Sequence, residues 1–479
     1  MATIVLSAAG AAIGGSIGGA VAGLSSVAIG RAVGATLGRA IDDRLLGSGS
    51  DAIETGRVDR FRLTEAGQGA PIPQIYGRTR IGGQVIWASQ FAETTTVSGG
   101  GKGAPSQPRT TSYSYSISLA IALCQGEIAA VPRIWADGEE VSARDLNMTL
   151  YRGTQDQLPD PLMEAIEGTG EVPAYRGTAY VVFEDLALES FGNRVPQFSF
   201  EVVRPEQPGS PEYSQDLGQL VQGVALLPGT GEYTLATTAV HYGIGPGQAT
   251  GANSHTASGQ SDFSTSLAGL CSELPSCQAT SLIVSWFGDD LRCGQCQIKP
   301  KVEQKQAEGV PMAWRVSGET RTSADLVPVD GEGRGVYGGT PSDAAVIEAI
   351  QALKLSGKRV MFYPFVLMDQ VAGNSLPDPW SDATTQPPLP WRGRITLSKA
   401  PGLPGTPDQT LAAEAEVAAF MGAATAADFT VAGGQVSYTG AADWGLRRFI
   451  LHNAALCAAA GGVAAFCIGS EMRGLTQIR

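Results

Sequence analysis

Four carboxylates stand just after short apolar runs, where acidic side chains could transfer protons. Asp289 and Asp290 follow TSLIVSWFG, Asp369 follows RVMFYPFVLM, and Glu471 lies just beyond GVAAFCIG. Two carboxyl groups about 5–9.5 Å apart can cleave a glycosidic bond. Acids at strand ends also cap helices and pair with arginines. Glu471, Asp369 and Asp290 are therefore candidate catalytic residues, with a structural role as the alternative.

Four cysteines form a second candidate site, because their spacing is C-x5-C followed later by C-x2-C. They are Cys271, Cys277, Cys293 and Cys296, from seven cysteines in all. A structural zinc site often uses paired C-x2-C units, and the first gap is too long for that pattern. Disulfides or chance packing are favoured over zinc or an iron–sulfur cluster, and we predict no metal and no cofactor.

Other motifs give weaker signals. The glycine-rich stretches PGTGEY and GIGPGQATG lack the Lys-Ser/Thr of a phosphate-binding loop. The three histidines, His241, His255 and His452, lie far apart in the sequence without the context of a catalytic triad. Four tryptophans could line a sugar-binding face, although such residues more often anchor a core or an interface: Trp286, Trp314, Trp380 and Trp391.

The elements that would position these side chains alternate between strand and helix patterns over the last 270 residues. The helical stretch DAAVIEAIQALK is followed by Gly357 and a buried strand, and WGLRRFILHNAALCAAA begins a second such unit. This rhythm predicts a TIM barrel. About four strands are present where a closed barrel needs eight, so we expect a truncated barrel whose remainder lies outside this sequence.

The region from about Arg57 to Pro205 shows short alternating runs separated by Gly and Pro, which predict a β-rich domain. We expect two strands around Gly82 and Gly83, a flexible loop over residues 98–112, and a long strand over 113–126. A hairpin with Asp137 and Gly138 at its tip should follow, and then two strands within 175–205. An ordinary β-rich globular domain would read the same way.

Composition indicates a subunit of an assembly. Charged residues make up 16% of the 479 residues, below the roughly 25% of a typical soluble domain. Glycine, at 62 residues, is nearly twice its ordinary frequency. The net charge of −13 and the absence of a basic tract argue against a general nucleic-acid surface.

The first forty residues carry glycines in three series with a spacing of four. Residues four apart share one face of a helix, so each series would make a groove for a neighbouring helix. Because each helical Gly costs about 1 kcal/mol relative to Ala, we predict a helical hairpin or bent helix, broken at Ser25–Ser26 and packed in an oligomer. A membrane anchor is the alternative. A signal peptide is excluded, because the segment lacks the basic residues with which a signal peptide begins. The series are Gly10, Gly14 and Gly18; Gly15, Gly19 and Gly23; and Gly30, Gly34 and Gly38.

Two groups of segments resemble known tail proteins. The stretches PQIYGRTRIGGQVIW, IALCQGEIAAVPRIWADG and AYRGTAYVVFEDLALESFGNRVPQFSFEV resemble the tail-tip hub proteins of long-tailed phages, the lambda tip attachment family. The later stretches VSWFGDDLRCGQCQIKPKVE, VYGGTPSDAAVIEAIQALK, FYPFVLMD, PWRGRIT and FCIGSEMRGL resemble the TIM-barrel-like domain of the gene transfer agent baseplate "megatron" protein.

The resemblance implies a structural baseplate protein of a phage-like particle. Such a protein forms a homotrimer that closes the tail tube, with N-terminal helices that plug the channel and enter the host envelope for DNA delivery. It implies assembly in the bacterial cytoplasm, release in the virion and late disulfides. Its implied partners are distal tail and hub proteins, the tape-measure protein and the host outer envelope, with DNA passing through unbound. The implied domains are 1–48 (plug), 49–208 (β-rich hub) and 209–479 (barrel).

Two other functions stay open. The first is a glycoside hydrolase carried on the tail tip that degrades envelope glycan or peptidoglycan. In glycosidases resembling this fold, the general acid/base stands at the position that Glu471 occupies here. Their second carboxylate comes from a later strand of the barrel, which this sequence does not contain. We therefore expect no turnover from this chain alone. Glu471 could instead simply pair with Arg473 or Arg479. The second is a membrane-anchored β-rich protein unrelated to tails.

Overall fold

The computed structural model describes residues 69–98, 110–245, 247–432 and 435–479, together with the backbone of three short strands nearer the N-terminus. Two of these strands, β1 (Ala20–Val21) and β2 (Leu24–Ser25), pair antiparallel where a helical segment is predicted. Residues 99–109 of the predicted loop lie outside the described residues. The predicted helix-packing glycines also lie outside them: Gly10, Gly14, Gly15, Gly18, Gly19, Gly23, Gly30, Gly34 and Gly38.

Two compact units divide the chain, and each is assembled from separate segments. The first unit comprises residues 1–63, 88–118 and 185–195, and the second comprises 64–87, 119–184 and 196–479. These limits do not coincide with the predicted domain boundaries at 48 and 208, which stay predictions.

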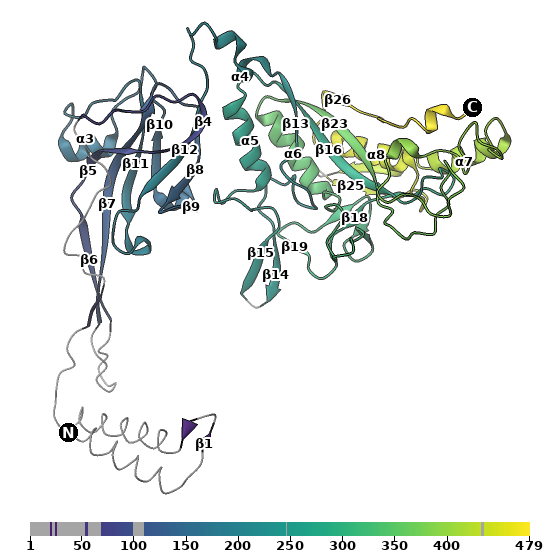
Figure 1. Ribbon diagram of the computed structural model, residues 1–479, viewed down its shortest axis with the longest axis horizontal. Coiled ribbons are helices and arrows are strands. Elements are labelled where there is room, and N and C mark those ends of the chain that lie inside the picture. Colours follow the sequence, from purple (N-terminus) through teal and green to yellow (C-terminus); the bar gives the residue numbers. More distant parts are fainter. Residues whose placement is uncertain are drawn as a thin grey trace. The chain divides into compact units, whose positions relative to one another are not determined.

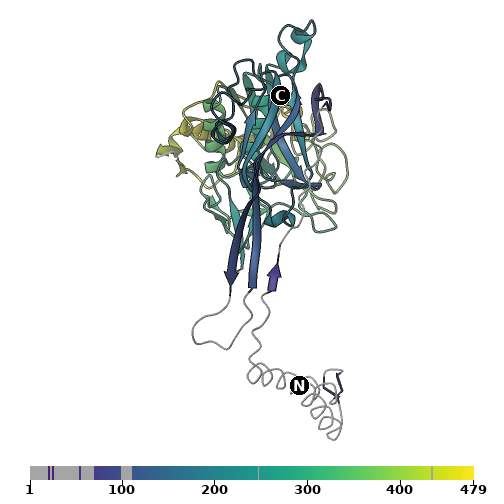
Figure 2. The same cartoon turned by 90° about the vertical axis from the view of Figure 1, so that its left-hand side faces the viewer.

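The first unit contains a long antiparallel strand pair. Strand β6 (Ala92–Ser98) pairs along its whole length with the first half of β7 (Thr110–Gln125), from Ser98 opposite Thr110 to Ala92 opposite Ser116. Strand β3 (Ile53–Thr55) lies parallel to the start of β7. Figure 2 shows β6 and β7 side by side. The predicted strand over 113–126 is therefore confirmed, but it begins at Thr110, and β6 runs to Ser98. Both described ends of the predicted loop over 98–112 are thus strand, because they pair with each other.

The β-rich part of the second unit confirms the predicted strands and shows how they pair. One antiparallel sheet has the order β4-β12-β8-β9, and β5, β10 and β11 belong to the sheet of β7. The tip residues Asp137 and Gly138 both have positive φ, 51° and 92°, as a two-residue hairpin turn requires. The elements are β4 (Gly77–Gly82), β5 (Gln84–Ala88), β8 (Ala130–Ala136), β9 (Glu139–Val141), β10 (Met148–Tyr151), α3 (Pro161–Glu167), β11 (Thr178–Ala187) and β12 (Phe198–Arg204).

Strands β4 and β5 leave Gly83 in different directions, because β4 pairs with β12 and β5 with β7. A side chain at Gly83 would lie 2.1 Å from Cγ2 of Ile121 and 3.1 Å from the carbonyl oxygen of Ala122. Glycine is therefore required where the chain passes from one sheet to the other.

The C-terminal part of the second unit is built on four parallel strands, as predicted (Figure 1). Their order is β13-β16-β23-β26, helices α5, α6 and α8 lie in the successive connections, and β17 pairs antiparallel with β16. Four is half the number in a closed barrel. The elements are β13 (Gly223–Leu226), α5 (Asp262–Glu273), β16 (Ala279–Gly288), β17 (Ile298–Lys299), α6 (Asp343–Leu355), β23 (Arg359–Met368), α8 (Leu446–Ala459) and β26 (Ala465–Phe466).

Burial alternates along the two central strands with the period of two expected of a sheet. In β16, Leu282, Val284 and Trp286 are buried in a core that also holds Ile350 of α6 and Phe449 of α8. Alternate residues are only half-buried, and they lie on the face that would point into a closed barrel: Ser281, Ile283 and Ser285 of β16, and Tyr363, Phe365 and Leu367 of β23.

Helix caps and smaller elements complete this part. Ser261 and Ser342 cap α5 and α6 by accepting hydrogen bonds from Ser264 and Ala345. No helix among the described residues is long and apolar enough to span a bilayer. The remaining elements are α4 (Leu217–Leu220), β14 (His241–Gly245), β15 (Gln248–Gly251), β18 (Lys301–Val302), β19 (Gly309–Val310), β20 (Arg315–Val316), β21 (Glu319–Thr320), β22 (Asp325–Leu326), α7 (Leu411–Met421), β24 (Phe429–Ala432) and β25 (Gln435–Tyr438).

Candidate functional site

The predicted carboxylates meet at one edge of the parallel sheet. Strands β16 and β23 are in register to their last residues, Gly288 opposite Met368, and the backbone N–H of Asp369 donates to the carbonyl of Gly288 at 3.2 Å. Asp289 and Asp369 therefore leave adjacent strands at the same level. The carboxyl edge is where barrel enzymes place their catalytic groups.

Asp290 is held in a structural ion pair. Arg292 donates to it from Nε at 3.1 Å and from a terminal nitrogen at 2.6 Å, and the Gln386 amide donates at 2.7 Å. The carboxylate is 4% exposed. With both oxygens engaged by side-chain donors, the geometry gives Asp290 the role of ordering the loop after β16.

Asp369 is also buried and paired. Nζ of Lys301, from β18, lies 2.5 Å from its Oδ2, and the two side chains are 13% and 4% exposed. Burial raises the pKa of Asp369, and the neighbouring Lys301 ammonium opposes that rise. Lys301 lies 68 positions before Asp369 in the sequence, so no sequence motif indicates that the two side chains pair.

Asp289 receives a backbone hydrogen bond from Gln297 at 2.8 Å. Burial raises its pKa, a rise opposed by this hydrogen bond and by Lys301, while the charges of Asp369 and Asp290 add to it. Three aspartates and one lysine thus share this edge. They form an electrostatic group in which Lys301 offsets the negative charge of Asp289 and Asp369, and Arg292 that of Asp290.

Glu471 lies beyond β26 and is 54% exposed. Its Oε2 accepts a hydrogen bond from Nε1 of Trp391 at 2.7 Å and lies 3.1 Å from a guanidinium nitrogen of Arg392. Its backbone has a positive φ of 57°. The pairing predicted with Arg473 or Arg479 is wrong, because Arg479 bonds to Asp408 at 3.1 Å and Arg392 supplies the cation.

Arg392 is the anchor of this second cluster. Its guanidinium lies 3.7 Å from the ring centroid of Phe365, donates to Oγ of Ser470 at 2.9 Å, and reaches the Tyr363 hydroxyl at 3.3 Å. Tyr363 and Phe365 belong to the inward face of β23. The stacking of Arg392 on Phe365 and its hydrogen bond to Ser470 therefore hold the segment that carries Glu471. The sequence alone does not indicate these contacts.

The tryptophans predicted for a sugar-binding face separate into two groups. Trp286 and Trp314 are fully buried core residues, so they cannot line a surface. Trp380 is half-buried and donates to the carbonyl of Arg394 at 2.7 Å. Trp391 is 46% exposed beside Glu471.

Two of the three histidines each bond to an aspartate at the start of a helix. His452 is buried on α8 and bonds to Asp343 at 2.9 Å, while His255 bonds to Asp262 at 2.7 Å. Each pair joins a helix start to a neighbouring segment, so both have a structural explanation.

The predicted cysteine site contains free thiols. Cys271 is exposed, whereas Cys277, Cys293 and Cys296 are buried, and none of the chain's seven cysteines is joined in a disulfide. Burial raises the pKa of Cys293 to about 12. Among the described residues, no three Cys, His, Asp or Glu side chains are placed to hold a metal ion.

A buried charge network after β13 is not evident from the sequence. Arg321 donates to Glu232 and to the Tyr233 hydroxyl at 3.0 Å each, and its Nε donates to Glu308 at 3.0 Å. Burial alone would raise the pKa of Glu308, but hydrogen bonds from Trp314 and Arg321 lower it to about 2. The sequence signal for this network is the motif PGTGEY, because its Glu232 and Tyr233 both bond to Arg321.

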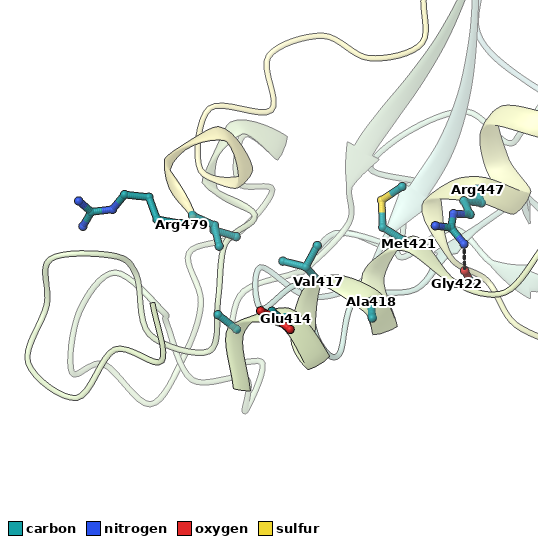
Figure 3. Close-up of a pocket in the computed structure, with 9 residues that line it drawn as sticks. Glu414, Val417, Ala418, Met421, Gly422, Arg447 and Arg479 are labelled. Carbon is teal, nitrogen blue, oxygen red and sulfur yellow. Dashed lines mark hydrogen bonds between the residues drawn. The ribbon is translucent and has the colours of Figure 1, made fainter. Parts of the chain in front are cut away.

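A groove of about 460 Å³ runs along α7 (Figure 3). Val417, Met421 and Ile478 give it an apolar floor, with Glu414 and Arg447 also lining it. Arg447 donates to the carbonyl of Gly422 at 3.3 Å. None of the predicted catalytic residues lines this groove.

The C-terminal residues 444–479 match the family model of the GTA TIM-barrel-like domain. These residues comprise α8, β26 and the Glu471 segment. No curated protein matches the chain. A chain from the virion of a native gene transfer agent (GTA) particle is 52% identical over 47% of this chain and 44% of that chain, with a TM-score of 0.28. Our chain thus spans less than half the length of that relative. The C-terminal part of the chain is thus similar to the GTA TIM-barrel-like domain.

Proposed function

We propose that this chain is a tail-tip hub protein of a gene transfer agent, and that three copies close the distal end of the tail tube. The match of residues 444–479 to the GTA TIM-barrel-like domain carries the proposal. It falls on the last helix–strand unit of the parallel sheet, α8 and β26, and the β-rich region before this sheet is consistent with the hub resemblance.

In this proposal the N-terminal glycine series form the contacts among the three copies. Residues spaced by four lie on one helix face, and faces without side chains let helix backbones approach closely. The helices would plug the channel and enter the host envelope when DNA leaves. The low charge content, 16%, supports a subunit that is surrounded by others.

The test is a paired substitution in intact particles. Gly14→Val with Gly18→Val should block assembly or DNA delivery, because two branched side chains would hold the helices apart. Gly14→Ala with Gly18→Ala is the matched control and should reduce delivery far less. Normal delivery by the valine pair would contradict the plug, and a particle reconstruction without threefold copies of this chain would contradict the hub.

The described carboxylates give little support to glycan hydrolysis. Hydrolysis needs one carboxyl group as acid and a second as base or nucleophile. Asp290 and Asp369 are each bound to a cation, and Glu471 is held by Trp391 and Arg392. Glycan turnover by the full-length protein that is lost in Glu471→Gln would reverse this assessment.

A further inference from the structure

Two adjoining hollows at the carboxyl edge of the parallel sheet form what we call the Glu303 cleft. Their volumes are about 340 and 400 Å³, within the range of small-ligand sites. Ile283, Ser285 and Leu367 bring the inward face of β16 and β23 to one end of it. The residues that line both hollows are Thr230, Gly335, Tyr337 and Gly338.

Glycines form the wall of the cleft because two chain segments touch there. A side chain at Gly338 would lie 2.5 Å from the backbone nitrogen of Gly231, and one at Gly231 would lie 2.8 Å from Oε1 of Glu303. Both distances are below van der Waals contact. PGTGEY and VYGG, the stretches that contain these glycines, therefore meet around the Glu303 carboxylate. This close approach explains why PGTGEY is rich in glycine although it lacks the Lys-Ser/Thr of a phosphate-binding loop.

Glu303 is the charged side chain of this lining. Its Oε1 accepts a hydrogen bond from the backbone N–H of Gly339 at 2.8 Å. Within the described part of the chain, no Lys, Arg or His forms an ion pair with it, because Arg321 pairs with Glu232 and Glu308, and Lys301 pairs with Asp369. Glu303 is exposed, so its carboxylate can accept hydrogen bonds from a ligand.

Two further groups suit a hydroxyl-bearing ring. Thr234 lines the cleft, is 7% exposed, and its buried hydroxyl has no hydrogen-bond partner among the described residues. A buried hydroxyl without a partner is costly, and a ligand hydroxyl would satisfy it. Tyr337 is half-buried and lines both hollows. Its aromatic ring offers an apolar surface beside these polar groups.

We propose that the Glu303 cleft binds an uncharged saccharide whose hydroxyl groups donate to Glu303 and bond to Thr234, with a sugar ring against Tyr337. A phosphate-bearing ligand is disfavoured because the lining presents a carboxylate and no cationic side chain among its described residues. This binding site goes beyond the proposed structural role, and it requires no reaction.

The experiment titrates the purified chain with cellobiose, maltose and N,N′-diacetylchitobiose, followed by ligand-observed NMR, and compares glucose with glucose 6-phosphate. At least one neutral disaccharide should bind, and glucose 6-phosphate should bind more weakly than glucose. Glu303→Gln keeps the acceptor for Gly339 but removes the charge, and should weaken binding at least tenfold. Glu332→Gln, at an exposed glutamate of the neighbouring loop, is the matched control and should bind as the unchanged chain does.

Thr234→Val provides an independent variant, because it removes a hydroxyl without a partner and keeps the side-chain shape. It should fold normally and weaken binding severalfold. The proposal is overturned if no neutral disaccharide binds, if Thr234→Val and a folded Glu303→Gln both bind undiminished, or if the sugar phosphate binds more tightly than glucose.

Discussion

The ammonium of Lys301 lies 2.5 Å from the carboxylate of Asp369, with both side chains largely buried. Lys301 begins β18, and Asp369 follows the last residue of β23, so the ion pair ties a long connection to the edge of the parallel sheet. Breaking such a pair leaves one buried charge without its counter-charge, which costs more than the pair contributes when intact.

We expect Lys301→Met to lower the free energy of unfolding by about 3 kcal/mol, because Asp369 would be left buried without a cation. Urea denaturation measures this. Lys399→Met is the matched control, since Lys399 pairs with Asp382, whose side chain is 99% exposed, and should cost less than about 1 kcal/mol. Equal losses in the two variants would contradict the buried pair.

The pH dependence of stability should show the raised pKa of Asp289. Burial raises this pKa above its usual value of 3.8, so the folded chain holds the proton more tightly than the unfolded chain. The resulting stabilisation is fully present below the unfolded pKa and is lost as pH rises through the folded pKa. The free energy of unfolding of wild type, relative to that of Asp289→Asn, should therefore be highest below about pH 4. This difference should shrink as the pH rises above that value.

The control for this pH series has the opposite sign. The hydrogen bond and charge of Lys399 lower the pKa of Asp382, so wild type measured against Asp382→Asn should lose stability as pH falls through that lowered value. Parallel pH curves for wild type and Asp289→Asn would show that Asp289 titrates alike in the folded and unfolded chain.

Arg392→Ala should destabilise the chain by about 3 kcal/mol, because it removes the stack on Phe365 and leaves the polar groups around Ser470 without a donor. Thermal or urea unfolding would measure the loss. Arg334→Ala, at an arginine that is 69% exposed and paired with Asp330, should cost under about 1 kcal/mol. A similar small effect in both variants would mean that Arg392 does not anchor the Glu471 segment.

The cysteines should react in the order of their exposure. Cys271 is exposed, and burial raises the pKa of Cys124 to about 11 and of Cys293 to about 12. Because the thiolate is the reactive form, iodoacetamide should label Cys271 first in the native chain, as followed by mass spectrometry. All seven thiols should react after denaturation without reductant, and fewer than seven would indicate a disulfide.

Local signals in the sequence predicted the elements well. Gly357, with φ 75°, follows the helix end, and the apolar runs of β16 and β23 mark buried parallel strands. The β8–β9 hairpin follows from Asp137 and Gly138, residue types that tolerate positive φ. Each of these depends on neighbours within a few positions, which is why pattern and turn chemistry suffice.

The sequence by itself determined that acids follow successive strands, and thus that Asp289 and Asp369 share one edge of a parallel sheet. Only the tertiary structure decided how the acids are paired, because Lys301 reaches Asp369 and Arg392 reaches Glu471 from connections that no spacing specifies. Burial and ion pairing depend on contacts distant in sequence, whereas strand and helix formation depends on local periodicity. The tertiary structure alone also brought Gly231, Gly338 and Glu303 together, since their closeness depends on how two connections pack.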